Sequence, residues 1–135
     1  MTNPSYGFEA KLEGISVSEA IQRVTEALKV EGFGVLTSID IQKAFSEKLG
    51  VDFRPYVILG ACNPKLAHKA LGADPYLGLL LPCNVVVQEM PGGKVSVTIA
   101  DPAAMFELVK GANVEPIAAD ARERLGRVLE AVRGS

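Results

Sequence analysis

The sequence is poor in the residues that build metal and nucleophilic sites. It contains one histidine, His68, and two cysteines, Cys62 and Cys83. The cysteines form no CxxC pair, and with His68 they give the spacing C-x5-H…C, which matches no standard zinc site. The patterns GxSxG, HExxH and GxxxxGK[ST] are also missing. These absences argue against a serine hydrolase, a zinc protease and a phosphate-binding loop.

The chain also lacks an excess of basic charge and a long apolar run. Its 14 lysines and arginines are scattered among 16 acidic residues, for a net charge of −2, so we expect no nucleic-acid partner. The longest apolar run, GLLLPCNVVV, is too short to cross a bilayer, and the N-terminus shows no signal-peptide pattern. We therefore expect a cytoplasmic protein with no membrane partner, with reduced cysteines and with no cofactor.

Segments with strand periodicity alternate with segments of helical periodicity. Strands are predicted over 6–12, 34–39, 56–62, 82–90 and 94–100, and helices over 17–31, 41–49, 64–71, 102–110 and 114–134. The expected N-caps of the first three helices are Ser16 or Ser18, with a capping box favouring Ser16, then Asp40 and Asn63. This order predicts a single α+β domain over residues 1–135, in which a mainly antiparallel sheet packs against helices in two layers.

The segment PGGK (91–94) predicts a β-hairpin. If all four residues form the loop, Met90 faces Val95 and Asn84 faces Asp101. The predicted core face then carries Val86, Met90, Val95, Val97 and Ile99, and the other face carries Cys83, Val85, Val87, Thr98 and Ala100. Because this second face is still apolar, it needs cover, and we expect a homodimer through it.

Each cysteine lies beside an asparagine and near a proline, in GACNP (60–64) and LPCNV (81–85). Cys62 directly precedes the predicted N-cap of a helix, where the partial positive charge stabilises a thiolate. One hypothesis is therefore a thiol-based redox protein using Cys62 and Cys83, and a weaker one is a metal site that adds His68. The simpler interpretation is that both cysteines pack as small apolar residues.

Polar residues also gather at the ends of the predicted apolar strands. Cys62, Asn63, Asn84 and Asp101 could hold a ligand there. Arg54 could clamp an anion or form an ion pair with Asp52. The leading hypothesis is a homodimeric module that binds a small ligand without catalytic activity, and whether the chain is an enzyme is left open. A structural or assembly domain with no ligand is a further alternative.

The run GFGVLTSIDIQKAFSEKLGVDFRPYVILGACNPKLAHKAL, followed by GLLLPCNVVV, resembles the small prokaryotic domains of the domain of unknown function 302 family. Its most telling residues are Gly60 and Cys62–Pro64 in the first motif and Leu81–Val85 in the second. The resemblance covers about residues 6–110 and implies a fold similar to the TATA-binding-protein type, with a curved antiparallel sheet against helices. It places the chain in a cysteine-containing branch and supplies no catalytic residues.

Overall fold

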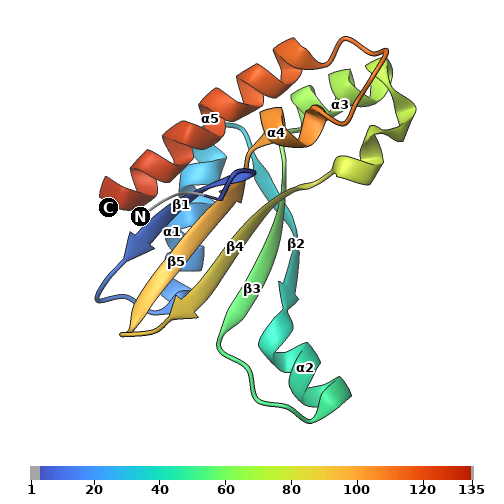
Figure 1. The fold of residues 1–135 in the computed structure, drawn as a ribbon. Helices are drawn as coiled ribbons and strands as arrows, with labels where there is room; N and C mark the ends of the chain where they lie inside the picture. Colours follow the sequence, from blue (N-terminus) through green and yellow to red (C-terminus); the bar gives the residue numbers. More distant parts are fainter. Residues whose placement is uncertain (1–3, 135) are drawn as a thin grey trace.

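A five-stranded antiparallel sheet forms the centre of the protein (Figure 1). The computed structural model describes residues 4–134, and within them the strands lie in the order β1-β5-β4-β3-β2. The strands are β1 (Gly7–Leu12), β2 (Gly34–Asp40), β3 (Tyr56–Cys62), β4 (Cys83–Met90) and β5 (Lys94–Ala100). The helices are α1 (Val17–Val30), α2 (Ile41–Leu49), α3 (Pro64–Ala73), the 3-10 helix η1 (Pro75–Leu80), α4 (Pro102–Phe106) and α5 (Glu115–Gly134). The predicted α+β class and the order of elements are confirmed.

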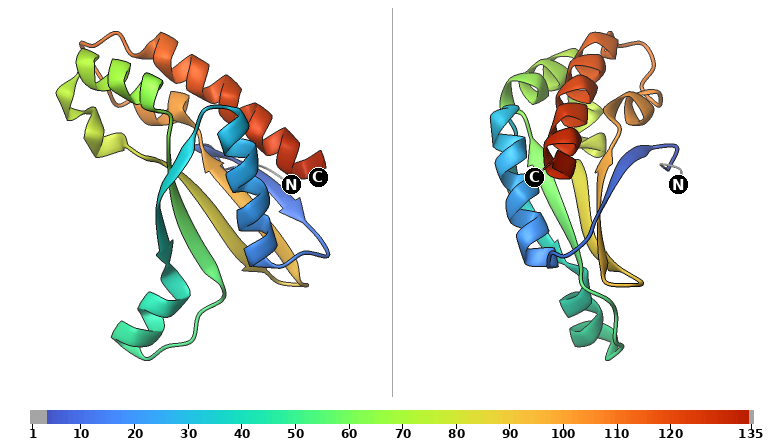
Figure 2. Two further views of the ribbon diagram at one scale, coloured as in Figure 1. Left: turned by 180° about the vertical axis from the view of Figure 1, so that it is seen from behind. Right: turned by 90° about the vertical axis from the view of Figure 1, so that its left-hand side faces the viewer.

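Helices α1 and α5 pack on one face of the sheet, as both views of Figure 2 show. The core between these two layers is made of the apolar stripes of the helices and the inward side chains of the strands. Val24 and Leu28 from α1 and Leu125 from α5 meet Val97 and Ile99 from β5, and all five are fully buried. Burial of a valine or leucine stabilises the fold by about 1.5–3 kcal/mol. A second cluster, around Leu77 and Phe106, lies under α3, η1, α4 and α5.

Side chains that bind free backbone amides mark the helix starts, as the sequence predicts. The Ser16 hydroxyl accepts from the Glu19 amide at 3.1 Å, and the Asp40 carboxylate accepts from the Lys43 amide at 2.9 Å. Both caps satisfy an amide that the helix itself leaves unpaired. Helix α4 is shorter than predicted and ends at Phe106, because the chain continues in tighter turns such as Val109 N to Phe106 O.

The β4–β5 hairpin has a different register from the one predicted. Met90 pairs with Lys94 and Val85 with Ile99, so the loop has three residues and not four. Gly92 and Gly93 both have positive φ angles, which permits this tighter loop. Residues 95, 97 and 99 face the core as predicted, but on β4 the core residues are Val85 and Val87, not Val86 and Met90.

The ends of β2 and β3 carry α2 away from the rest of the molecule, at the bottom of Figure 1. None of the residues of α2 is buried. Within this arm, residues 40–56, the Phe45 and Phe53 rings are 5.0 Å apart, and the Phe53 and Tyr56 rings are 5.9 Å apart. Among residues 4–134, no helix is both long enough and apolar enough to span a membrane.

Candidate functional site

The two Cys-Asn motifs lie side by side on neighbouring strands. Ala61 of β3 pairs with Cys83 of β4, and Gly60 pairs with Asn84. The glycine of the first motif is required by close packing, because a Cβ atom on Gly60 would overlap the Thr37 hydroxyl and come within 2.8 Å of Pro82 Cγ. The register of β3 and β4 therefore brings together two motifs whose cysteines are 21 residues apart in the chain.

Both cysteines are free thiols, and both line one small apolar cavity. The volume of this cavity is about 30 Å³, enough for a water-sized molecule but too small for a metabolite. Burial raises the pKa of the Cys83 thiol to about 11, with a further contribution from nearby Cys62. Cys83 therefore stays protonated at neutral pH, which is unfavourable for a nucleophile or a metal ligand.

His68 does not line the small cavity that the two cysteines share. It lies on an exposed part of α3. Within residues 4–134, no three histidine, cysteine or acidic side chains form a group that could hold a metal ion. The structure therefore does not bring Cys62, His68 and Cys83 together as a three-ligand cluster.

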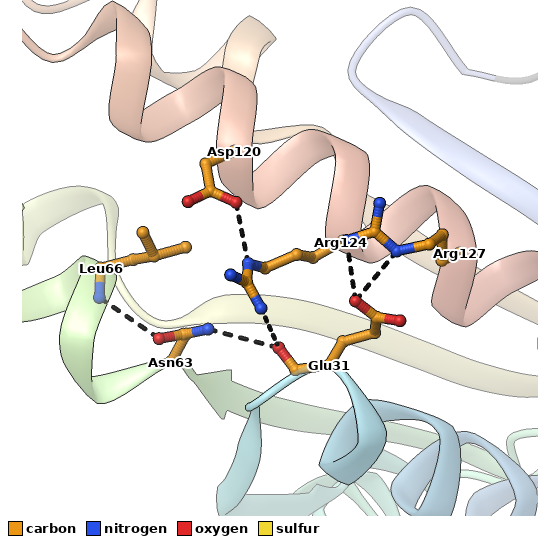
Figure 3. Close-up of polar contacts among 6 residues, drawn as sticks. All are labelled: Glu31, Asn63, Leu66, Asp120, Arg124 and Arg127. Atoms are coloured by element: carbon orange, nitrogen blue, oxygen red, sulfur yellow. Dashed lines mark hydrogen bonds and ion pairs between the residues drawn. The ribbon is translucent and has the colours of Figure 1, made fainter.

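Asn63 is a structural residue at the junction of three helices (Figure 3). Its Oδ1 accepts from the Leu66 amide at 3.2 Å and caps α3, and its Nδ2 donates to the Glu31 carbonyl at 3.4 Å. Arg124 from α5 donates to the same carbonyl at 3.2 Å, and Arg127 binds the Glu31 carboxylate. The Asn63 amide is buried and already bonded at both ends, so it has little capacity left for a ligand.

Asp101 is also engaged within the fold. One carboxylate oxygen accepts from the Ala103 amide at 2.9 Å and caps α4, and the other pairs with Arg122 at 3.3 Å. Because Val85 pairs with Ile99, Asp101 lies one position beyond the residue that faces Asn84. The predicted Asn84–Asp101 pair is thus wrong, because the predicted hairpin register was wrong by one residue.

Arg54 lies at the opposite end of the sheet from the cysteines. Its guanidinium stacks over the Phe53 ring at 4.5 Å and donates to Gln88 Oε1 at 2.9 Å, and it forms no pair with Asp52. Gln88 pairs with Tyr56 at the start of β3, whereas Asn84 pairs with Gly60 near its end. Arg54 therefore belongs to the base of the arm and not to the strand ends that carry the motifs.

Asn84 is a predicted site residue whose side chain remains available to a ligand. Its side chain has no hydrogen-bond partner among residues 4–134 and is exposed on the sheet face opposite α1 and α5. It borders two neighbouring hollows, of about 190 Å³ and about 210 Å³, which also share Ala100 and Met105. The sequence showed no sign of Met105, since only the fold of the short α4 places it beside β4.

Comparison with known proteins identifies relatives but no activity. The family described as Domain of unknown function DUF302 matches residues 8–132, which includes most of α5 and extends well beyond residue 110. A solved structure, that of an uncharacterized conserved protein DUF302 from Bacillus stearothermophilus, is similar to this chain. It has 32% sequence identity and a TM-score of 0.87, and the match covers 96% of this chain and 100% of that one. No curated protein is similar enough to count as a match.

Proposed function

The chain belongs to the family described as Domain of unknown function DUF302, and we propose that it is a homodimeric module that binds a small ligand without catalytic activity. The observation that carries the proposal is the free amide of Asn84 between two hollows with mostly apolar walls. Apolar concave surfaces with a few convergent polar groups are the usual form of a ligand site. The two free thiols suit a reducing compartment, the cytoplasm.

A thermal-shift screen against small metabolites tests ligand binding, because a ligand that binds only the folded state raises the melting temperature. We expect hits that stabilise the wild type and lose most of that effect in Asn84→Leu. The matched control is Asn113→Leu, because Asn113 is an exposed asparagine that lines neither hollow. A broad panel with no hits, or hits that stabilise all three proteins equally, would count against a site at Asn84.

The dimer is proposed through the edge strand β2 rather than through the face that the predicted register suggested. Val85 and Val87 of that face are covered by helices. On β2, the Leu36 and Ile39 side chains are 70% and 49% exposed, and the strand contains neither lysine nor proline. Native proteins normally protect such edges. The other edge is protected, since Arg133 Nη2 donates to the Glu9 carbonyl of β1 at 2.8 Å.

A second copy could pair its own β2 with this edge about a two-fold axis, which would satisfy both strands at once. Sedimentation velocity over a concentration series should show a dimer that Ile39→Lys shifts to monomer. Leu108→Lys, at a 72% exposed position outside β2, serves as the control. A wild type that is monomeric at all concentrations would remove the dimer from the proposal.

Thiol chemistry is the second candidate, favoured only by the approach of the two cysteine motifs on adjacent strands. If Cys62 and Cys83 form a redox pair, mild oxidation should yield an intramolecular disulfide with a mass loss of two hydrogens. We expect instead that the native protein keeps two free thiols, since the raised pKa of Cys83 disfavours thiolate attack.

A further inference from the structure

The two hollows that share Asn84, called the groove below, have an uncharged lining. The lining of the first hollow includes Leu79, Leu81 and Phe106, and that of the second includes Tyr6, Val86 and Thr98. No lysine, arginine, histidine, aspartate or glutamate among residues 4–134 lines either of them. An ionised ligand group in this groove would lose hydration without gaining a partner of opposite charge, which is costly.

Two charged residues adjoin the lining along the chain, Asp101 after Ala100 and Glu107 after Phe106, and neither lines a hollow. Asp101 follows Ala100 of the groove, but its carboxylate caps α4 and pairs with Arg122. Cys83, which also borders the first hollow, is a protonated thiol at neutral pH because burial raises its pKa. The groove therefore offers apolar contact together with neutral hydrogen-bonding groups.

Besides the Tyr6 hydroxyl, two neutral polar side chains of the lining, Asn84 and Thr98, could meet a ligand. The Asn84 amide is free to donate and to accept. The Thr98 hydroxyl shares a hydrogen bond of 3.2 Å with Ser96 Oγ and keeps further bonding capacity. Asn84 stands where the two hollows meet, so a polar group bound to it would have apolar surface on both sides.

We propose that this groove binds an uncharged amphiphile, with its aliphatic part along the leucine, methionine and valine side chains and a hydroxyl, carbonyl or amide group on Asn84. This inference rests on the proposed function and adds the chemical class of the ligand. Each hollow alone is smaller than an ordinary ligand pocket of about 300–1,000 Å³, and a ligand that spans both is in the expected size range.

The test compares two probes of equal chain length that differ in charge, 1-decanol and decanoate. Both would compete with the neutral dye Nile red at pH 7.5, where decanoate is ionised, below the concentrations at which they form micelles. We expect decanol to displace the dye at least tenfold more effectively than decanoate. Asn84→Leu should weaken decanol binding by about three- to tenfold, because one hydrogen bond is lost, and Asn113→Leu should have no effect.

The outcomes separate the two proposals. Equal or stronger binding of decanoate would overturn the uncharged class, while ligand binding at the groove would stand. Failure of both probes, together with an empty thermal-shift screen, would overturn ligand binding itself. A change in oligomeric state on Asn84→Leu, detected by sedimentation, would mean that a second copy covers the groove, and this too would overturn the amphiphile proposal. Circular dichroism of each variant checks that it is folded.

Discussion

The Asn63 side chain donates its amide to the Glu31 carbonyl at 3.4 Å, across 32 residues of sequence. Glu31 is the C-cap of α1, and Asn63 is the N-cap of α3. One side chain therefore satisfies a free amide at the start of one helix and a free carbonyl at the end of another. Arg124 adds a third helix to this junction (Figure 3). These two hydrogen bonds, to the start of α3 and to the end of α1, explain the asparagine of the GACNP motif.

Replacement of Asn63 should show both of its roles. Asn63→Ala removes the cap and the bond to Glu31, and we expect a loss of about 2–4 kcal/mol in the free energy of unfolding. Asn63→Asp keeps the acceptor that caps α3 but turns a carboxylate oxygen toward the Glu31 carbonyl, so any loss in this variant reports the bond to Glu31 and not the cap. Asp40→Ala, at the cap of the exposed α2, is the control and should cost about 1 kcal/mol or less. Equal losses in Asn63→Ala and Asp40→Ala, measured by urea unfolding, would contradict the junction.

Gly60 should tolerate no side chain. In Gly60→Ala the new methyl group would meet the Thr37 hydroxyl and Pro82 Cγ, and we expect a loss of about 1–3 kcal/mol from overpacking. Adding Thr37→Ala should recover part of that loss, which a double-mutant cycle measures. Gly126→Ala in α5 is the control, because it meets nothing within 4 Å and should stabilise the helix by about 0.5–1 kcal/mol. A Gly60→Ala variant that is as stable as the wild type would contradict the close contact at Gly60.

The register of β4 predicts opposite outcomes at two adjacent valines. Val85 is fully buried against the helices, whereas Val86 lies on the other face. Val85→Thr keeps the shape but buries a hydroxyl, and should cost about 1–3 kcal/mol. Val86→Thr should change stability by no more than about 0.5 kcal/mol. Thermal unfolding of the two variants decides the register. The predicted four-residue loop would bury Val86, so it requires the larger loss of stability in Val86→Thr.

The thiol of Cys83 should make stability depend on alkaline pH. Its pKa is raised from 9.0 to about 11, mainly by burial and secondarily by Cys62. The folded state holds the thiol proton more tightly than the unfolded state does. The protonated thiol therefore makes its full contribution to the free energy of unfolding below pH 9, and this contribution is lost as the pH rises through about 11. The advantage of the wild type over Cys83→Ala should therefore shrink by about 2–3 kcal/mol across that interval. Urea unfolding at pH 8 and pH 11 measures it, and an unchanged difference would show that Cys83 is not buried.

Local features of the sequence were sufficient to predict the elements. The alternation in 6–12 and the helical stripe of residues 20, 24 and 28 depend only on neighbours in the chain. The caps at Ser16, Asp40 and Asn63 likewise depend on residues three positions away. For these reasons the order of strands and helices and the α+β class followed directly from the residues.

The site depended on contacts that the chain makes over long distances. A shift of one residue in the hairpin exchanged the two faces of β4, and the positive φ angles of Gly92 and Gly93 accommodate the shorter loop. Asn63 and Asp101 looked available in the sequence, but helices far away in the chain supply their partners. Asn84 remained available because its side chain lies on the face of the sheet opposite α1 and α5. Periodicity specifies which residues share a face, whereas only packing decides which face is covered and which polar groups are left for a ligand.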